Sequence, residues 1–228
     1  MSFSHRFVVV ACIFITCLIT ANIIGAKVVA LGSFILPAAV FLFPLSYIFG
    51  DILTEVYGYH QARRIIWLGF LCNLIFVIFA WVGQILPPAP LWEGQEAYKT
   101  ILGYTPRLLA ASFCGYLAGE FGNSFVLAKL KILTKGRWLW TRTISSTMVG
   151  QGLDTVIFII GAYFGAPFFI PMMILYHWLA KIGIEALATP LTYTAVNFLK
   201  KREAIDTYDY ETNFNPFHIW GKEGEVIS

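Results

Sequence analysis

The sequence predicts an all-α, polytopic membrane protein with six transmembrane helices. Apolar residues make up 58% of the 228 positions, and the mean hydropathy is +0.70. Only 13% of the residues are charged, about half the fraction found in soluble domains. Apolar runs recur at about 20 residues, the length that a helix needs to cross a bilayer. This composition disfavours a soluble enzyme or a nucleic-acid-binding module, so we expect no nucleic acid among the partners.

Helices are expected in these runs because backbone groups in hydrocarbon must satisfy their own hydrogen bonds. The six expected spans cover residues 7–25, 37–56, 65–86, 106–130, 144–165 and 170–199. The first run is 19 residues long and no A-x-A site follows it, so we expect a retained helix rather than a signal peptide. Residues 1–199 would form one transmembrane domain, and residues 200–228 a polar cytoplasmic tail.

Two connecting segments stand out between the spans. The segment from Lys27 to Leu36 is short and mostly apolar, and Gly32 and Ser33 would allow it to be re-entrant or interfacial. The loop at 87–105 carries three prolines and a glycine near its start, residues that interrupt helices.

The distribution of basic residues predicts the orientation. Eleven Lys and Arg residues fall on the side of the N-terminus, and three fall on the opposite side. Cytoplasmic loops carry an excess of Lys and Arg. We therefore expect a multi-pass protein of the cytoplasmic (inner) cell membrane with both termini in the cytoplasm.

No motif in the sequence indicates catalysis, a metal or a cofactor. HExxH, GxSxG and P-loop patterns are absent. The four cysteines lie in apolar runs without a CxxC pair, which argues against a disulfide scaffold or a zinc site. We therefore expect a protein that is not an enzyme, with no catalytic residues, no metal site and no cofactor.

Ionisable residues inside the expected spans are the most informative feature. They are five acids and one lysine, namely Asp51, Glu55, Glu120, Asp154, Lys181 and Glu185. Each costs roughly 2.5–3.5 kcal/mol at a helix centre, so they should face the interior of the bundle. One interpretation is that they join helices to one another. A purely structural network would neutralise itself, however, and this excess of acids favours protonated carboxyls or a donor-rich ligand.

Helical spacing predicts that these residues share one interior site. Asp51 and Glu55 lie four residues apart and so share a face, as do Lys181 and Glu185. By the same rule Asn123 accompanies Glu120, and Gln151 accompanies Asp154. We expect a substrate site near mid-bilayer, the depth that alternating-access carriers use, formed by Asp51, Glu120, Asn123, Gln151, Asp154, Lys181 and Glu185.

Other roles remain open for some of these residues. Asp51 and Glu55 could bind a proton that drives solute entry. Lys181 and Glu185 could form only an internal salt bridge. Small residues at Ala111, Gly115 and Gly119 predict close helix packing, and they allow a homodimer.

Five ordered motifs resemble the queuosine-precursor transporter family, also described as vitamin-uptake transporters. They are DILTEVYG (51–58), GEFGNSFVLAKLK (119–131), RTISSTMVGQGLDTVIF (142–158), KIGIEALATPLTY (181–193) and YDYETNFNPF (208–217). The resemblance implies a six-helix importer of 7-deazapurines such as 7-cyano-7-deazaguanine, related to the substrate-binding subunits of energy-coupling-factor transporters. A carboxylate would then accept the N–H and amino groups of the guanine-like edge, and amides would read its carbonyl.

Two alternatives remain open. The chain could be the substrate-binding subunit of an ATP-driven vitamin or nucleobase importer, which needs separate subunits. It could also be an integral membrane enzyme, which would release a chemically altered product.

Overall fold

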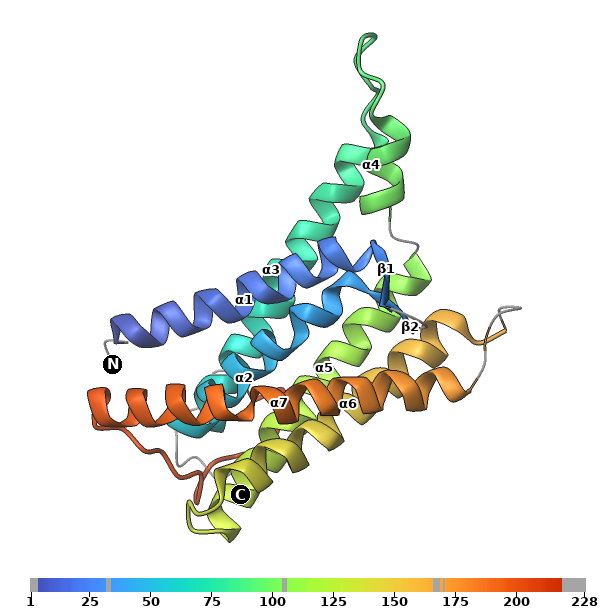
Figure 1. Cartoon of the computed structure of the whole chain (residues 1–228). Coiled ribbons are helices and arrows are strands. Elements are labelled where there is room, and N and C mark those ends of the chain that lie inside the picture. The colour runs from blue at the N-terminus through green and yellow to red at the C-terminus, as the bar shows by residue number, and fades with distance from the viewer. Residues whose placement is uncertain (1–3, 32–33, 104–105, 166–168, 170, 219–228) are drawn as a thin grey trace.

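The computed structural model describes residues 4–31, 34–103, 106–165, 169 and 171–218. The chain forms a bundle of helices with one short hairpin (Figure 1). The helices are α1 (His5–Gly25), α2 (Phe43–Tyr57), α3 (Tyr59–Ile85), α4 (Gln95–Leu102), α5 (Pro106–Leu133), α6 (Leu139–Tyr163) and α7 (Met172–Glu203). The predicted predominance of helix is confirmed.

The hairpin is the main departure from the predicted all-α fold. Strands β1 (Val28–Leu31) and β2 (Phe34–Pro37) pair antiparallel, with Val28 opposite Pro37 and Leu31 opposite Phe34. Gly32 and Ser33, which we expected in a re-entrant or interfacial connector, lie outside the described residues. A Gly-Ser pair between two short apolar runs is a hairpin signal, which the hydropathy of the segment does not reveal.

Helix α2 is shorter than the span expected from its hydropathy. The predicted span began at Pro37, but Pro37 ends β2 and residues 38–41 form a 3₁₀ turn. The helix begins at Phe43 and has a proline in its first turn, a position that needs no backbone N–H partner. Pro44 therefore starts α2 rather than breaking it.

Three helices in the described part of the chain are long and apolar enough to cross a membrane. They are α1, α3 and α6. In Figure 1, α4 folds back on the far end of α3, so the expected loop at 87–105 contains a helix. Three such helices fit a multi-pass membrane protein.

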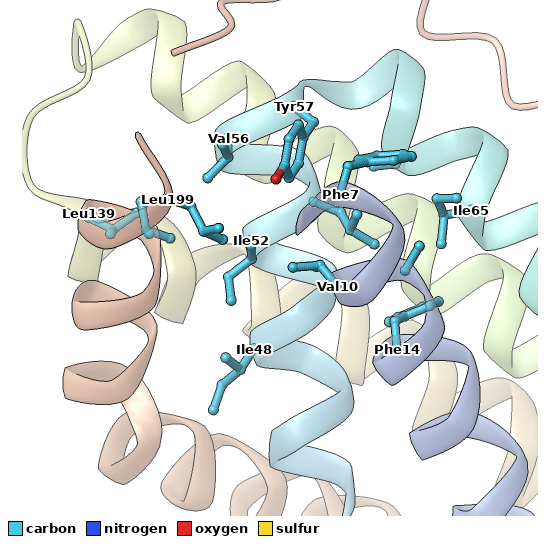
Figure 2. Close-up of a cluster of buried hydrophobic side chains, with 14 residues drawn as sticks. Phe7, Val10, Phe14, Ile48, Ile52, Val56, Tyr57, Ile65, Leu139 and Leu199 are labelled. Carbon is cyan, nitrogen blue, oxygen red and sulfur yellow. The ribbon is translucent and has the colours of Figure 1, made fainter. Parts of the chain in front are cut away.

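The apolar core lies where α1 meets α2 (Figure 2). Ile48, Ile52 and Val56 recur every four residues and form one stripe of α2. Phe7 and Phe14 of α1 join this cluster, and Phe14 is fully buried. The cluster extends to α3, α6 and α7 through Ile65, Leu139 and Leu199. This packing buries one face of α2. A neighbouring face carries Asp51 and Glu55 and contacts α5, α6 and α7.

Helices α6 and α7 run antiparallel along each other. The backbone N–H of Trp140, near the start of α6, donates to the Tyr193 hydroxyl at 2.9 Å, near the end of α7. Further along α6, the Trp178 indole donates to the Met148 carbonyl at 2.9 Å. These contacts show that α6 and α7 pack along each other through long side chains.

Candidate functional site

Close packing of α5 on α6 brings their polar residues together. A Cβ atom added to Gly119 would lie 2.8 Å from the Cβ of Asp154 and 3.0 Å from the carbonyl of Gly150. A Cβ added to Gly150 would lie 2.7 Å from the Cβ of Asn123. The glycines therefore allow the two backbones to approach closely, as the small-residue pattern predicted.

Asp51 and Asn123 join α2 to α5. The Asn123 amide donates to Asp51 Oδ1 at 2.8 Å, and both side chains are fully buried. Asp51 Oδ2 and Asn123 Oδ1 have no hydrogen-bond partner among the described residues. Glu120, one turn before Asn123, also reaches α2, because its Oε2 lies 3.3 Å from a Cβ position on Gly50.

Lys181 pairs with Asp154 and not with Glu185. Its Nζ lies 2.6 Å from Asp154 Oδ2, joining α7 to α6. The internal Lys181–Glu185 salt bridge that we considered is therefore wrong. Glu185 lies four residues beyond Lys181, roughly 6 Å along α7. Because α6 and α7 are antiparallel, this step along α7 runs in the same direction as the step from Asp154 back to Gly150, which packs against Asn123.

Buried polar atoms without partners lie at this level and within about one helical turn of it. In the described ranges they are Asp51 Oδ2, Glu120 Oε2, Asn123 Oδ1, Thr147 Oγ1, Gln151 Oε1 and Nε2, Thr155 Oγ1, and Glu185 Oε1 and Oε2. They come from four helices, and the charges of Asp51, Glu120, Asp154 and Glu185 are close enough to interact. Native proteins leave few buried polar groups unpaired, because each costs about 1–3 kcal/mol. We name these four acids, with Asn123, Gln151 and Lys181, the polar cluster.

Glu55 belongs to a separate ion cluster one turn further along α2. Its Oε1 lies 2.8 Å from Arg142 Nη2, 2.7 Å from Lys200 Nζ and 3.7 Å from Lys131 Nζ. Glu55, Arg142 and Lys131 are at most 1% exposed. Sequence patterns do not predict this cluster, because the three basic residues lie at helix ends, where an excess of Lys and Arg indicates orientation. Such positions give no local sign of a shared partner.

The segment after α7 packs against the ion cluster. Asp206 accepts from Lys131 at 2.6 Å and from Lys200 at 2.8 Å. Partial burial alone would raise the pKa of Asp206, but these two hydrogen bonds hold it below its ordinary value of 3.8. Lys131 also donates to the Glu55 and Thr207 carbonyls, both at 2.6 Å, so its three protons are used.

Further along, the same segment is fixed to the start of α3. The Tyr59 backbone N–H donates to both carboxylate oxygens of Asp209 at 3.1 Å. Arg63 donates to the carbonyls of Asn213 at 2.7 Å and Asn215 at 2.9 Å. The Trp67 indole donates to the Pro216 carbonyl at 2.8 Å. We call residues 204–218 the C-terminal strap.

Comparison with known sequences decides the family. The family described as "Putative vitamin uptake transporter" matches residues 37–195, which is most of the chain and includes every residue of the polar cluster. The chain belongs to this family. It is a transporter family rather than an enzyme family, as the motifs indicated.

Three curated relatives carry related names. A Bacillus subtilis protein, "Probable queuosine precursor transporter", is 31% identical over 160 residues, covering 67% of this chain and 68% of the relative. The Escherichia coli "Queuosine precursor transporter" is 28% identical over 56% of this chain, and a Haemophilus influenzae "Probable queuosine precursor transporter" is 27% identical over 62%. The matched segments span 55% and 56% of the latter two proteins. No solved structure matches the chain.

Proposed function

We propose that this transporter imports queuosine precursors, 7-deazapurines such as 7-cyano-7-deazaguanine, across the cytoplasmic membrane. The names of the three relatives support this substrate class. In the proposal, α1, α2, α3, α5, α6 and α7 cross the bilayer with both termini in the cytoplasm. We also propose that these six helices are arranged as in the substrate-binding subunits of energy-coupling-factor transporters. We further propose that the protein can form homodimers.

The observation that carries the proposal is the set of unpaired polar atoms in the polar cluster. Carboxylate oxygens outnumber donors there, so a bound molecule that offers several N–H groups would satisfy them. The guanine-like edge of a 7-deazapurine offers an N–H and an amino group side by side. Tyr47 is buried one turn before Asp51 on α2, and its ring would supply a face on which the ligand stacks.

The contacts separate the two residues that we considered for proton binding. Asp51 keeps one oxygen unpaired beside other acids, an arrangement suited to a carboxyl that takes up a proton. Glu55 faces three cations, and its contacts suit a fixed negative charge that holds helix ends together. In our proposal Asp51 therefore carries the proton-coupling role.

The test is uptake of labelled 7-cyano-7-deazaguanine into proteoliposomes that contain only this protein. We expect the unaltered compound to accumulate without ATP, and Glu120→Gln to abolish uptake. Glu96→Gln makes the same chemical change at an exposed position on α4 and should leave uptake unchanged. Wild-type vesicles that take up no more than empty ones would refute an autonomous carrier. Uptake only after addition of an ATPase module would support the ATP-driven subunit instead, and an altered product would indicate an enzyme.

A further inference from the structure

Glu185 differs from the other acids of the polar cluster in what its carboxylate contacts. It is 1% exposed, and both of its oxygens lack a hydrogen-bond partner among the residues that the structure describes. Asp51 has one oxygen occupied by Asn123, and Asp154 has one oxygen held by Lys181. Of the carboxylates in the described ranges, Glu185 alone has two buried, unpartnered oxygens.

Gln151 is the matching amide. It is fully buried, and both its Nε2 and its Oε1 lack partners among the described residues. Gln151 lies three residues before Asp154 on α6, and Glu185 lies four residues beyond Lys181 on α7. Because the two helices are antiparallel, both residues lie about one turn to the same side of the Lys181–Asp154 contact. A carboxylate with two free oxygens and an amide with a free NH₂ group therefore stand at the same level on neighbouring helices.

We propose that Glu185 accepts two parallel hydrogen bonds from the adjacent ring N–H and amino group of the ligand, and that Gln151 donates to the neighbouring ring carbonyl. This inference rests on the proposed function and names the two residues of the polar cluster that recognise the ligand. A 2-amino-4-oxo ring presents carbonyl, N–H and amino group in one row, so the amide and the carboxylate can read it side by side. Asp51 and Glu120, each with one buried unpaired oxygen, are left for other donors or a proton.

The assignment has a consequence for specificity. An analogue without the 2-amino group would leave one oxygen of a buried carboxylate unpaired. Sites built around a hydrogen-bonding group reject ligands that lack it, because their own polar atoms then lose a partner. We expect wild-type protein to bind such an analogue more weakly than the parent by roughly tenfold to a hundredfold.

The experiment combines a change in the ligand with a change in the protein. Binding of 7-cyano-7-deazaguanine and of its analogue without the 2-amino group is measured on purified wild type, Glu185→Gln and the control Glu96→Gln. We expect Glu185→Gln to bind the parent compound more weakly and to lose most of the discrimination, because a glutamine offers one acceptor where the carboxylate offers two. Glu96→Gln should discriminate as wild type does.

The outcomes separate this inference from the proposed function. Wild type that binds neither compound overturns both. Wild type that binds both compounds equally, or Glu185→Gln that still discriminates as wild type does, overturns the Glu185 assignment alone. If Glu185→Gln does not fold, Glu185→Asp replaces it. Its charge is kept but its side chain is one methylene shorter, so discrimination should fall, and undiminished discrimination would contradict the assignment.

Discussion

Replacing Glu55 by glutamine should destabilise the protein, although the substitution barely changes the volume of the side chain. Glu55 Oε1 holds Arg142 at 2.8 Å and Lys200 at 2.7 Å, with Lys131 at 3.7 Å. Removing one partner of a buried ion pair typically costs about 3–5 kcal/mol, because the remaining charge stays buried without compensation.

The contacts indicate the lower end of this range. The Lys200 side chain is 20% exposed and can turn to solvent, and Lys131 keeps its bond to Asp206. Arg142, at 1% exposure, keeps only longer bonds to Thr134 and to the Arg137 carbonyl among the described residues, both at 3.2 Å. The loss should therefore be about 3 kcal/mol. For a chain of this size that lowers the melting temperature by roughly 6–12 °C.

The assay is thermal unfolding of purified protein in detergent, followed by tryptophan fluorescence. Glu96→Gln is the matched control, because an exposed carboxylate should change stability by less than about 0.5 kcal/mol. A Glu55→Gln variant that melts within about 2 °C of wild type would refute the reasoning. That result would show that the contacts of Glu55 with Arg142 and Lys200 do not stabilise the fold, and it would restore Glu55 as a candidate for proton binding.

Three further predictions address other contacts. A Cβ on Gly150 would lie within 3 Å of α5, so Gly150→Ala should lower the free energy of unfolding by about 1–3 kcal/mol. A Cβ on Gly183 would have nothing within 4 Å, so Gly183→Ala should be neutral or slightly stabilising. Equal effects of the two substitutions would contradict the close packing of α5 on α6. The Lys181–Asp154 pair is partly buried, with side chains 9% and 18% exposed. Lys181→Met should lower stability by roughly 1.5–3 kcal/mol, and adding Asp154→Asn should recover most of the loss, because no charge then lacks its partner. No recovery would contradict the ion pair. Asp206 has a lowered pKa in the folded protein, so its contribution to docking of the C-terminal strap is complete above its ordinary pKa of 3.8 and is lost as the pH falls through the lowered value. Fluorescence energy transfer between labels on the strap and on α3 should report this loss, which Asp206→Asn should abolish.

The helices could be predicted from the sequence because apolar runs of the right length have few other structures in a membrane. The spans that begin near residues 7 and 106 match α1 and α5 closely. The start of α2 could not be placed by hydropathy, because the strands before it are equally apolar. The Gly-Ser pair at residues 32–33 predicts the hairpin before α2, whereas hydropathy does not.

The polar residues show where local patterns stop being informative. Spacing of four places Asp51 and Glu55 on one face of α2, but the two residues have partners on different helices. Asp51 bonds to Asn123, 72 residues away, and Glu55 bonds to Arg142, 87 residues away. Periodicity describes the face of a helix and contains nothing about which distant helix packs on it. For the same reason spacing along α7 suggests Glu185 as a possible partner of Lys181, whereas the ion pair forms with Asp154 on α6.

Binding of the ligand at the polar cluster, between α2, α5, α6 and α7, is the central claim. The most direct measurement is an experimental structure of the protein with 7-cyano-7-deazaguanine bound. We predict that the ring lies between these helices, with its amino edge on Glu185, its carbonyl on Gln151, and Asp51 and Glu120 within hydrogen-bond distance. A ligand bound elsewhere, with the polar atoms of the cluster paired to one another, would contradict this claim.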